Sequence, residues 1–157
     1  MHDLVPPHGR NALLPLLADE STRRTLKEKA ATLVPVPMSS REKSDLLLLA
    51  MGAYTPLKGF FGEADWRCTC EEMKLASGLF WPIPITLSVT VALADGISIG
   101  DEVVLMDPEE DNVPMAILMV TDKYESVPEF ECLPIQSCHH PLAAVVVSQL
   151  DHSRATY

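Results

Sequence analysis

Cysteine and histidine supply the side chains of this sequence that are best suited to metal chemistry. Cys68 and Cys70 lie two positions apart, and Cys138 is followed directly by His139 and His140. Tetrahedral zinc accepts thiolate and imidazole ligands, so the two groups together could hold a zinc ion. Their spacing differs from that of a familiar zinc knuckle, however, and Cys70 falls on the apolar face of an expected helix. We therefore expect buried free thiols and no metal site.

Catalytic groups have even less support in the sequence. A Cys–His nucleophilic pair would need a histidine held beside a chosen thiol, and nothing in the spacing places one there. Adjacent acids such as Glu71 and Glu72 do not face each other on a helix, so we interpret them as solvated surface. We predict no catalytic residue and no cofactor.

Phosphate-binding motifs are also missing from the sequence. No glycine-rich loop ends in Gly-Lys-Ser or Gly-Lys-Thr, and no GxGxxG stretch opens a helix after a strand. Gly52, Gly59 and Gly62 have the wrong spacing for these motifs, and we interpret them as backbone turns that need positive φ or close packing. Lys58 and the amides around it could still hold an anion, and this alternative stays open.

The composition describes one acidic domain spanning residues 1–157. With 47% hydrophobic residues, a chain of this length can bury one core. Twelve Lys and Arg face 22 Asp and Glu, and the net charge of -10 argues against a nucleic-acid partner. No segment reaches the roughly 18 uninterrupted apolar residues of a membrane span, and the first residues lack a secretory pattern. We expect a cytoplasmic protein without a membrane partner.

The first half of the sequence predicts an arm followed by three helices. Three prolines in residues 1–16 favour an ordered arm, packed on the core through Leu4, Val5, Leu13 and Leu14. The helices are expected from Asp19 to about Leu33, from a capping box at Ser39 and Glu42 to Gly52, and from Glu63 to Leu75.

The second half predicts strands. Residues from Phe80 to Val91 are rich in β-branched and aromatic types and are expected to be β, with prolines marking an edge or a bent start. Two further strand-like runs, 97–107 and 113–124, flank the polar turn DPEEDN. The run LAAVVVSQL, 142–150, fits either a helix or a strand by periodicity alone.

Three short motifs in order carry a resemblance to a known enzyme family. They are Ser44-Asp45-Leu46, GAYTPLKGF from Gly52 to Phe60, and Ala64-Asp65-Trp66, followed by WPIPITLSV at 81–89 and GDEVVLMD at 100–107. Over roughly residues 4–125 the chain resembles the N-terminal, PUA-like domain of sulfate adenylyltransferase (ATP sulfurylase). The resemblance implies an α+β fold, a PUA-like β-barrel with N-terminal and flanking helices.

The same resemblance implies a role in sulfur metabolism, in sulfate assimilation, without chemistry of its own. The family makes adenosine 5'-phosphosulfate and pyrophosphate from ATP and sulfate, using a Gln-x-Arg-Asn-Pro-x-His-x-x-His motif in a second, larger domain. This chain lacks that motif. We expect an accessory domain that is inactive alone and whose partner is the catalytic domain, in cis if the chain is a fragment and in trans if it stands alone.

The segment 125–157 departs from the family pattern, so its identity stays open. His140-Pro141 fits the family's Asp-x-x-His-Pro-Gly connector, but Ser137 replaces the acid and Leu142 replaces the glycine. A diverged stand-alone protein-interaction module is the alternative function, and a homo-oligomer is possible. RNA binding, suggested by the PUA-like fold name alone, conflicts with the acidic composition.

The conspicuous loop of the resemblance is the predicted contact site for the catalytic domain. Its prolines and glycines give a loop of low conformational entropy, with apolar anchors at Leu57 and Phe60. The expected contact residues are Thr55, Pro56, Leu57, Lys58, Gly59 and Phe60. The alternative is that this loop only caps the domain's own core.

Overall fold

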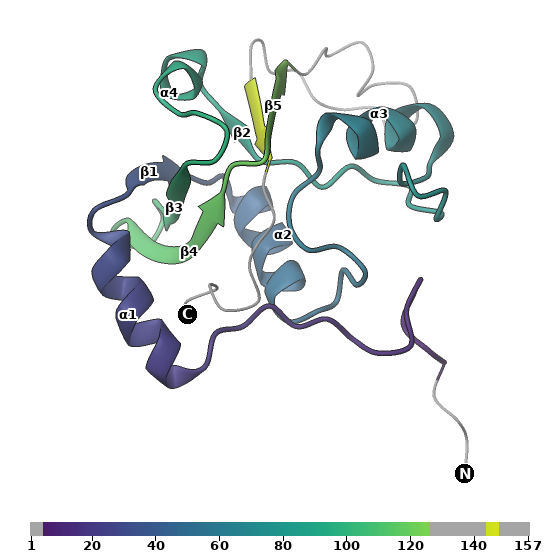
Figure 1. The fold of residues 1–157 in the computed structure, drawn as a ribbon, viewed down its shortest axis with the longest axis horizontal. Helices are drawn as coiled ribbons and strands as arrows, with labels where there is room; N and C mark the ends of the chain where they lie inside the picture. Colours follow the sequence, from purple (N-terminus) through teal and green to yellow (C-terminus); the bar gives the residue numbers. More distant parts are fainter. Residues whose placement is uncertain (1–4, 126–143, 148–157) are drawn as a thin grey trace.

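The computed structural model describes residues 5–125 and the backbone of residues 144–147. Helices surround two small sheets, with α1 and α3 on opposite sides of the molecule and α2 between them (Figure 1). Among the described residues, no helix combines the length and the apolar character that crossing a bilayer requires.

Helix α1 spans Glu20–Ala30 and begins where the sequence predicts. Its N-cap is Asp19, whose carboxylate accepts a hydrogen bond from the Thr22 amide at 2.8 Å. This bond lowers the pKa of Asp19 to about 2 because it favours the charged carboxylate. The helix buries Leu26 and Ala30 against the first sheet and leaves its charged face in water.

Helix α2 spans Ser40–Ala50 and confirms the predicted capping box. The Ser39 amide donates to the Glu42 carboxylate at 2.8 Å, and the Glu42 amide donates to the Ser39 hydroxyl at 3.3 Å. Gly52 follows the helix with φ +81°, a left-handed conformation that glycine adopts without strain. The helix buries Leu46 and Leu49 completely.

Helix α3 spans Glu63–Glu72 and ends earlier than the predicted Leu75. Met73 adopts a left-handed conformation with φ 55°, and its carbonyl accepts from the Trp81 amide at 2.8 Å. The chain reverses there, so Trp66 and Cys70 are buried as expected while Met73 is half exposed. The helix therefore ends at Glu72, because Met73 is left-handed and its carbonyl bonds to the Trp81 amide.

The first sheet has the order β1-β3-β4 and contains the predicted strand–turn–strand unit. Strands β3, Glu102–Asp107, and β4, Val113–Met119, pair antiparallel. Strand β1, Val34–Pro37, was not predicted and pairs parallel with β3. Strand β1 lies at the edge of the sheet and has a partner strand on one side only. Its prolines are tolerated there, because no second strand needs the amide donors that proline lacks.

The second sheet has the order β2-β6-β5. Its strands are β2, Ser88–Val89, β6, Ala144–Val147, and β5, Asp122–Glu125, all paired antiparallel. Strand β6 resolves the helix-or-strand alternative for residues 144–147. The predicted run 113–124 is therefore two strands, because the chain passes from one sheet to the other between β4 and β5.

Two predictions about β structure need correction. Residues 80–91 form a strand only at Ser88–Val89, since Pro82 and Pro84 lack amide donors and no neighbouring strand pairs with them. Thr90 then caps α4, Val91–Asp95. A closed barrel is not confirmed either: the strands of the described residues form two separate three-stranded sheets.

The core lies between the first sheet, α2 and the loops that follow α2 and α3. Fully buried side chains from each part meet there, including Val36, Leu46, Phe61, Trp66, Leu87, Leu105 and Leu118. The N-terminal arm contributes Leu14 and Leu16 to this core. Val5 and Leu13 are exposed, contrary to expectation, and Leu4 lies outside the described residues.

Candidate functional site

The loop Thr55–Phe60 leaves α2 through a turn held by side-chain hydrogen bonds. The Thr55 hydroxyl donates to the Gly52 carbonyl at 2.6 Å and accepts from the Leu14 amide at 2.9 Å. Thr55 is buried by these contacts, and the bond between Thr55 and Pro56 is cis. The threonine hydroxyl therefore ties the loop to the N-terminal arm and is used within the domain.

The loop's apolar side chains point into the chain's own core. Leu57 is 8% exposed and Phe60 is 4% exposed. Lys58 is exposed, and Pro56 is partly exposed. Any contact of this loop with another domain must therefore use Lys58, Pro56 and the backbone, whereas Leu57 and Phe60 stabilise the fold.

A cleft of about 540 Å³ lies beside this loop and is here called the loop cleft. It is lined by the loop, by the start of α3, by the chain after α3 and by the start of β5, with Lys58, Asp65, Ser77, Thr121 and Asp122 as its polar members. One lysine thus faces two aspartates. This balance does not favour an anion, so the cleft gives the Lys58 anion alternative little support.

The two aspartates of the loop cleft hold the backbone in place. Asp122 accepts from the Glu63 amide at 2.9 Å, and Asp65 accepts from the Ala76 amide at 2.8 Å. Because Gly62, the N-cap of α3, has no side chain, Asp122 supplies the missing cap from a distant strand. These carboxylates are therefore structural.

A second cleft of about 300 Å³, here called the aromatic cleft, lies alongside α2, which contributes Arg41 and Asp45 to its lining. Tyr54 and Trp81 line it with their rings 5.8 Å apart and nearly perpendicular. The remaining lining residues are Arg41, Asp45, Pro82, Ile83, Pro84 and Ile85. Nothing in the sequence pointed to this cleft, although Tyr54 and the WPIPI stretch belong to the motifs that carry the family resemblance.

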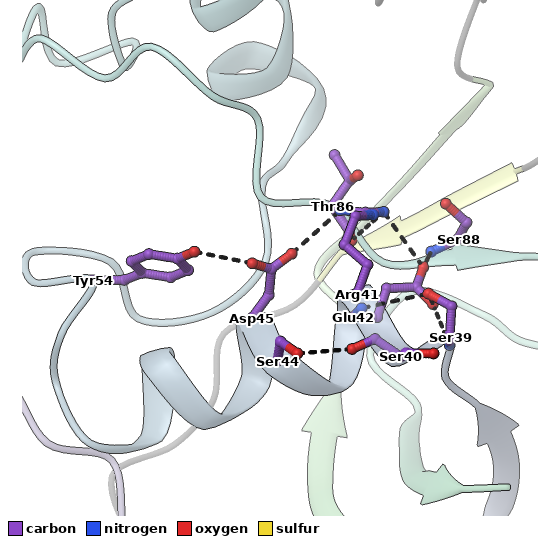
Figure 2. A network of polar contacts seen from close by, with 9 residues as sticks. All are labelled: Ser39, Ser40, Arg41, Glu42, Ser44, Asp45, Tyr54, Thr86 and Ser88. Carbon is purple, nitrogen blue, oxygen red and sulfur yellow. Dashed lines mark hydrogen bonds and ion pairs between the residues drawn. The ribbon is translucent and has the colours of Figure 1, made fainter. Parts of the chain in front are cut away.

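The polar wall of the aromatic cleft is a connected network (Figure 2). Asp45 accepts from the Tyr54 hydroxyl at 3.0 Å and from the Arg41 guanidinium at 3.2 Å. Desolvation raises the pKa of Asp45, and the hydrogen bond from Tyr54 opposes that rise. Burial also raises the pKa of Tyr54 to about 12, with the Asp45 charge adding to the effect.

Glu42 extends this network to the second sheet, as Figure 2 shows. Its buried carboxylate accepts from the Ser88 amide at 2.7 Å while it completes the capping box with Ser39. The start of α2 is thereby joined to β2. Both carboxylates accept hydrogen bonds from within the domain, so the network fixes the shape of the aromatic cleft.

The cysteines of the described residues fit the structural expectation. Cys68 is partly buried and Cys70 is buried, and both are free thiols. Within residues 5–125 no three His, Cys, Asp or Glu side chains gather closely enough to hold a metal ion. Cys138, His139 and His140 lie outside the described residues, so the absence of a metal site stays a prediction.

The fold and the clefts together define an α+β domain with one small mixed sheet, one small antiparallel sheet and no catalytic constellation among the described side chains. The chain belongs to the PUA-like domain family, which matches residues 5–153. This confirms the PUA-like part of the predicted fold.

Two of its curated relatives carry the same enzyme name. The chain is 46% identical, over 154 residues, to the sulfate adenylyltransferase of Syntrophobacter fumaroxidans, covering 95% of this chain and 37% of that protein. It is 45% identical to the sulfate adenylyltransferase of Desulforamulus reducens, covering 93% of this chain and 38% of that protein. The chain therefore spans little more than a third of the length of these relatives.

A solved structure shares the fold as well. The hexameric APS kinase from Thiobacillus denitrificans superposes with a TM-score of 0.73 at 28% identity. The match covers 96% of this chain and 27% of that protein. The same domain thus occurs as a minor part of a much longer chain.

Proposed function

We propose that this chain is the accessory N-terminal domain of a sulfate adenylyltransferase and has no catalytic activity alone. The observation that carries the proposal is the match of 95% of this chain to 37% of an enzyme of that name. The missing Gln-x-Arg-Asn-Pro-x-His-x-x-His motif supports the non-catalytic half of the proposal. The enzyme that carries the domain would convert ATP and sulfate to adenosine 5'-phosphosulfate and pyrophosphate in the cytoplasm.

The charges of the two clefts support the same view. Adenylyl transfer needs positioned cations or donors around the phosphates. The loop cleft offers one lysine with two aspartates, and the aromatic cleft offers Arg41 already paired with Asp45. Neither cleft resembles a phosphate site.

The loop Thr55–Phe60 is the proposed contact with the catalytic domain, in cis or in trans. Lys58 would supply its exposed side chain and the partly exposed Pro56 would add to the contact, whereas Gly59 is buried and would only shape the loop. Thr55, Leu57 and Phe60 would hold this surface in position from inside the domain. The loop is thus fixed by its own fold before a partner binds, which reduces the entropy lost on docking.

A chimera tests the accessory role. The 154-residue stretch of the Syntrophobacter fumaroxidans enzyme that matches this chain is replaced by this chain. We expect sulfate-dependent ATP–pyrophosphate exchange from the chimera and none from the isolated chain. An isolated chain with a robust sulfate-dependent rate would refute the non-catalytic role, and a folded chimera without activity would refute the accessory role.

A charge reversal tests the loop contact in the same chimera. Lys58→Glu should weaken exchange activity several-fold while leaving the melting temperature of the isolated chain unchanged, because Lys58 is exposed. Lys27→Glu is the matched control, since Lys27 is also exposed but lies on α1, at the opposite side of the molecule from α3 (Figure 1). Equal effects of the two changes would contradict the contact.

The hexameric state of the solved neighbour supports a further part of the proposal, that the complete enzyme is an oligomer. Light scattering on the chimera measures this directly. A monomeric, active chimera would overturn it.

A further inference from the structure

One long stretch of this acidic chain carries no ionisable side chain. Between Lys74 and Asp95 the sequence LASGLFWPIPITLSVTVALA contains no acid, base, tyrosine or cysteine, although 22% of the whole chain is charged. Part of this stretch is buried, but part faces solvent beside the aromatic cleft. A surface without charge in such a chain needs a physical reason, because a solvated face normally carries charge.

The exposed part is apolar, and its residues Pro82 and Ile83 line the aromatic cleft. Phe80 is 57% exposed and Ile83 is 52% exposed, and Pro82 between them is also exposed. Behind them, Tyr54, Trp81 and Ile85 line the aromatic cleft. We call Phe80, Pro82, Ile83 and this cleft the docking surface. An apolar centre beside a polar wall is the arrangement found at the middle of protein interfaces.

The docking surface is held in place at three points. The Trp81 amide donates to the Met73 carbonyl at 2.8 Å, and the His8 ring lies 2.7 Å from the Phe80 carbonyl. The Phe61 amide donates to the Ile85 carbonyl at 2.7 Å. The exposed apolar side chains therefore stand on a fixed backbone, which lowers the entropy cost of binding to them.

We propose that the docking surface binds the larger, catalytic part of a sulfate adenylyltransferase, with an apolar side chain of that part filling the aromatic cleft. This inference rests on the proposed function. It adds a second contact, separate from the loop Thr55–Phe60, whose large apolar side chains are already buried in this domain.

Size and charge both favour this occupant. The relatives are far longer than this chain, which covers 37% of one and 38% of another, so a domain of this kind has a large neighbour to contact. A second copy of this chain would bring another net charge of -10, and two such chains repel each other. The polar wall of the cleft is internally paired through Arg41 and Asp45, so the cleft favours an apolar group over an ionic one.

The test is the reactivity of a single introduced thiol. Ile83→Cys is made in the isolated chain and in the Syntrophobacter fumaroxidans chimera. Labelling by N-ethylmaleimide is measured for each peptide, so that the label on residue 83 is distinguished from the label on the native cysteines. We expect labelling to slow by about tenfold or more in the chimera, since the core of an interface excludes solvent. Ile99→Cys is the matched control, because Ile99 is equally apolar and 64% exposed but lies outside the docking surface. Its labelling should be the same in both proteins.

The outcomes separate this inference from the proposed function. A chimera that is active but labels at residue 83 as fast as the isolated chain overturns the docking surface and leaves the accessory role intact. Slow labelling of the isolated chain that depends on its concentration shows that a second copy covers the surface, and also overturns the inference. Loss of activity in the unmodified, folded chimera counts against the accessory role itself, and thiol protection is still measured there.

A second host keeps the test decisive. The same exchange in the Desulforamulus reducens enzyme, 45% identical to this chain, provides an independent chimera if the first does not fold. Protection of residue 83 with free labelling of residue 99 in either folded host supports the docking surface. Equal labelling in every folded host refutes it.

Discussion

The Tyr54 hydroxyl donates a hydrogen bond to the Asp45 carboxylate across 3.0 Å and so joins the loop after α2 to the helix itself. Asp45 is buried, and the Arg41 guanidinium contacts its other oxygen at 3.2 Å. The pair forms the polar wall of the aromatic cleft, where the ring of Tyr54 also meets Trp81. Removing one hydroxyl therefore tests both the fold and the shape of the cleft.

Replacing Tyr54 by Phe should lower the free energy of unfolding by about 1 kcal/mol, the usual worth of one hydrogen bond. Burial raises the pKa of Asp45 above its unfolded value, so the folded state binds more protons and this carboxyl costs stability as pH rises through that window. The Tyr54 bond offsets that cost, so its loss should matter more at about pH 7 than at about pH 3. Urea unfolding at both pH values measures the difference. If Tyr54→Phe costs the same when Asp45 is already Ala, which has no acceptor, the bond contributes nothing.

Lys43 bridges two acids from the first sheet and the turn after it. Its ammonium donates to Glu109 at 2.9 Å and to Asp107 at 3.0 Å, and these bonds raise the pKa of Lys43 and lower those of both carboxyls. A carboxyl with a lowered folded-state pKa adds stability above its unfolded pKa and loses it as pH falls through the folded value.

Lys43→Met should therefore destabilise the protein at neutral pH and flatten its loss of stability in acid. The midpoint of urea unfolding, followed from neutral to acid pH, measures both effects. Lys74→Met is the matched control, because Lys74 pairs at 3.3 Å with Glu72 on the surface, where ion pairs contribute little. Parallel pH profiles for the wild type and Lys43→Met would contradict the prediction.

Asp122 caps α3 from the strand β5, since Gly62 cannot. Asp122→Ala should destabilise the protein by about 1 kcal/mol, the typical worth of a lost N-cap. Asp122→Asn keeps an oxygen that can accept from the Glu63 amide and should retain most of the stability. Denaturant unfolding of both variants makes the comparison. If alanine and asparagine behave alike, the cap is not what Asp122 contributes.

Alanine substitutions at Gly52 and Gly78 distinguish the cost of backbone strain from the cost of steric crowding. Both are left-handed, with φ of +81° and +84°, so alanine strains either site by about 1 kcal/mol or more. A Cβ at Gly52 would lie 3.0 Å from the Leu14 and Pro15 backbone, whereas nothing lies within 4 Å of a Cβ at Gly78. Gly52→Ala should therefore lower the thermal midpoint clearly more than Gly78→Ala. Equal shifts would show that the N-terminal arm moves away from the new Cβ without a loss of stability.

The features predicted correctly are those that a few neighbouring residues encode. The Asp19 cap, the Ser39–Glu42 box and the turn at Gly52 each depend on groups within one or two helical turns. The hairpin around DPEEDN follows from alternation and from turn residues. The ordered motifs from Ser44 to Trp66 also indicated the PUA-like family.

What the sequence did not reveal depends on contacts between distant residues. Val34 pairs with Val103, which makes a strand of an unpromising VPVP segment, while residues 81–87 lack a strand partner despite their β-rich composition. Asp122 reaches an amide 59 positions away. The tertiary structure alone decided that Leu57 and Phe60 point inward while Phe80 and Ile83 stay in solvent. Side-chain type favours burial for all four, but only the packing of the whole chain determines which of them finds a place in the core.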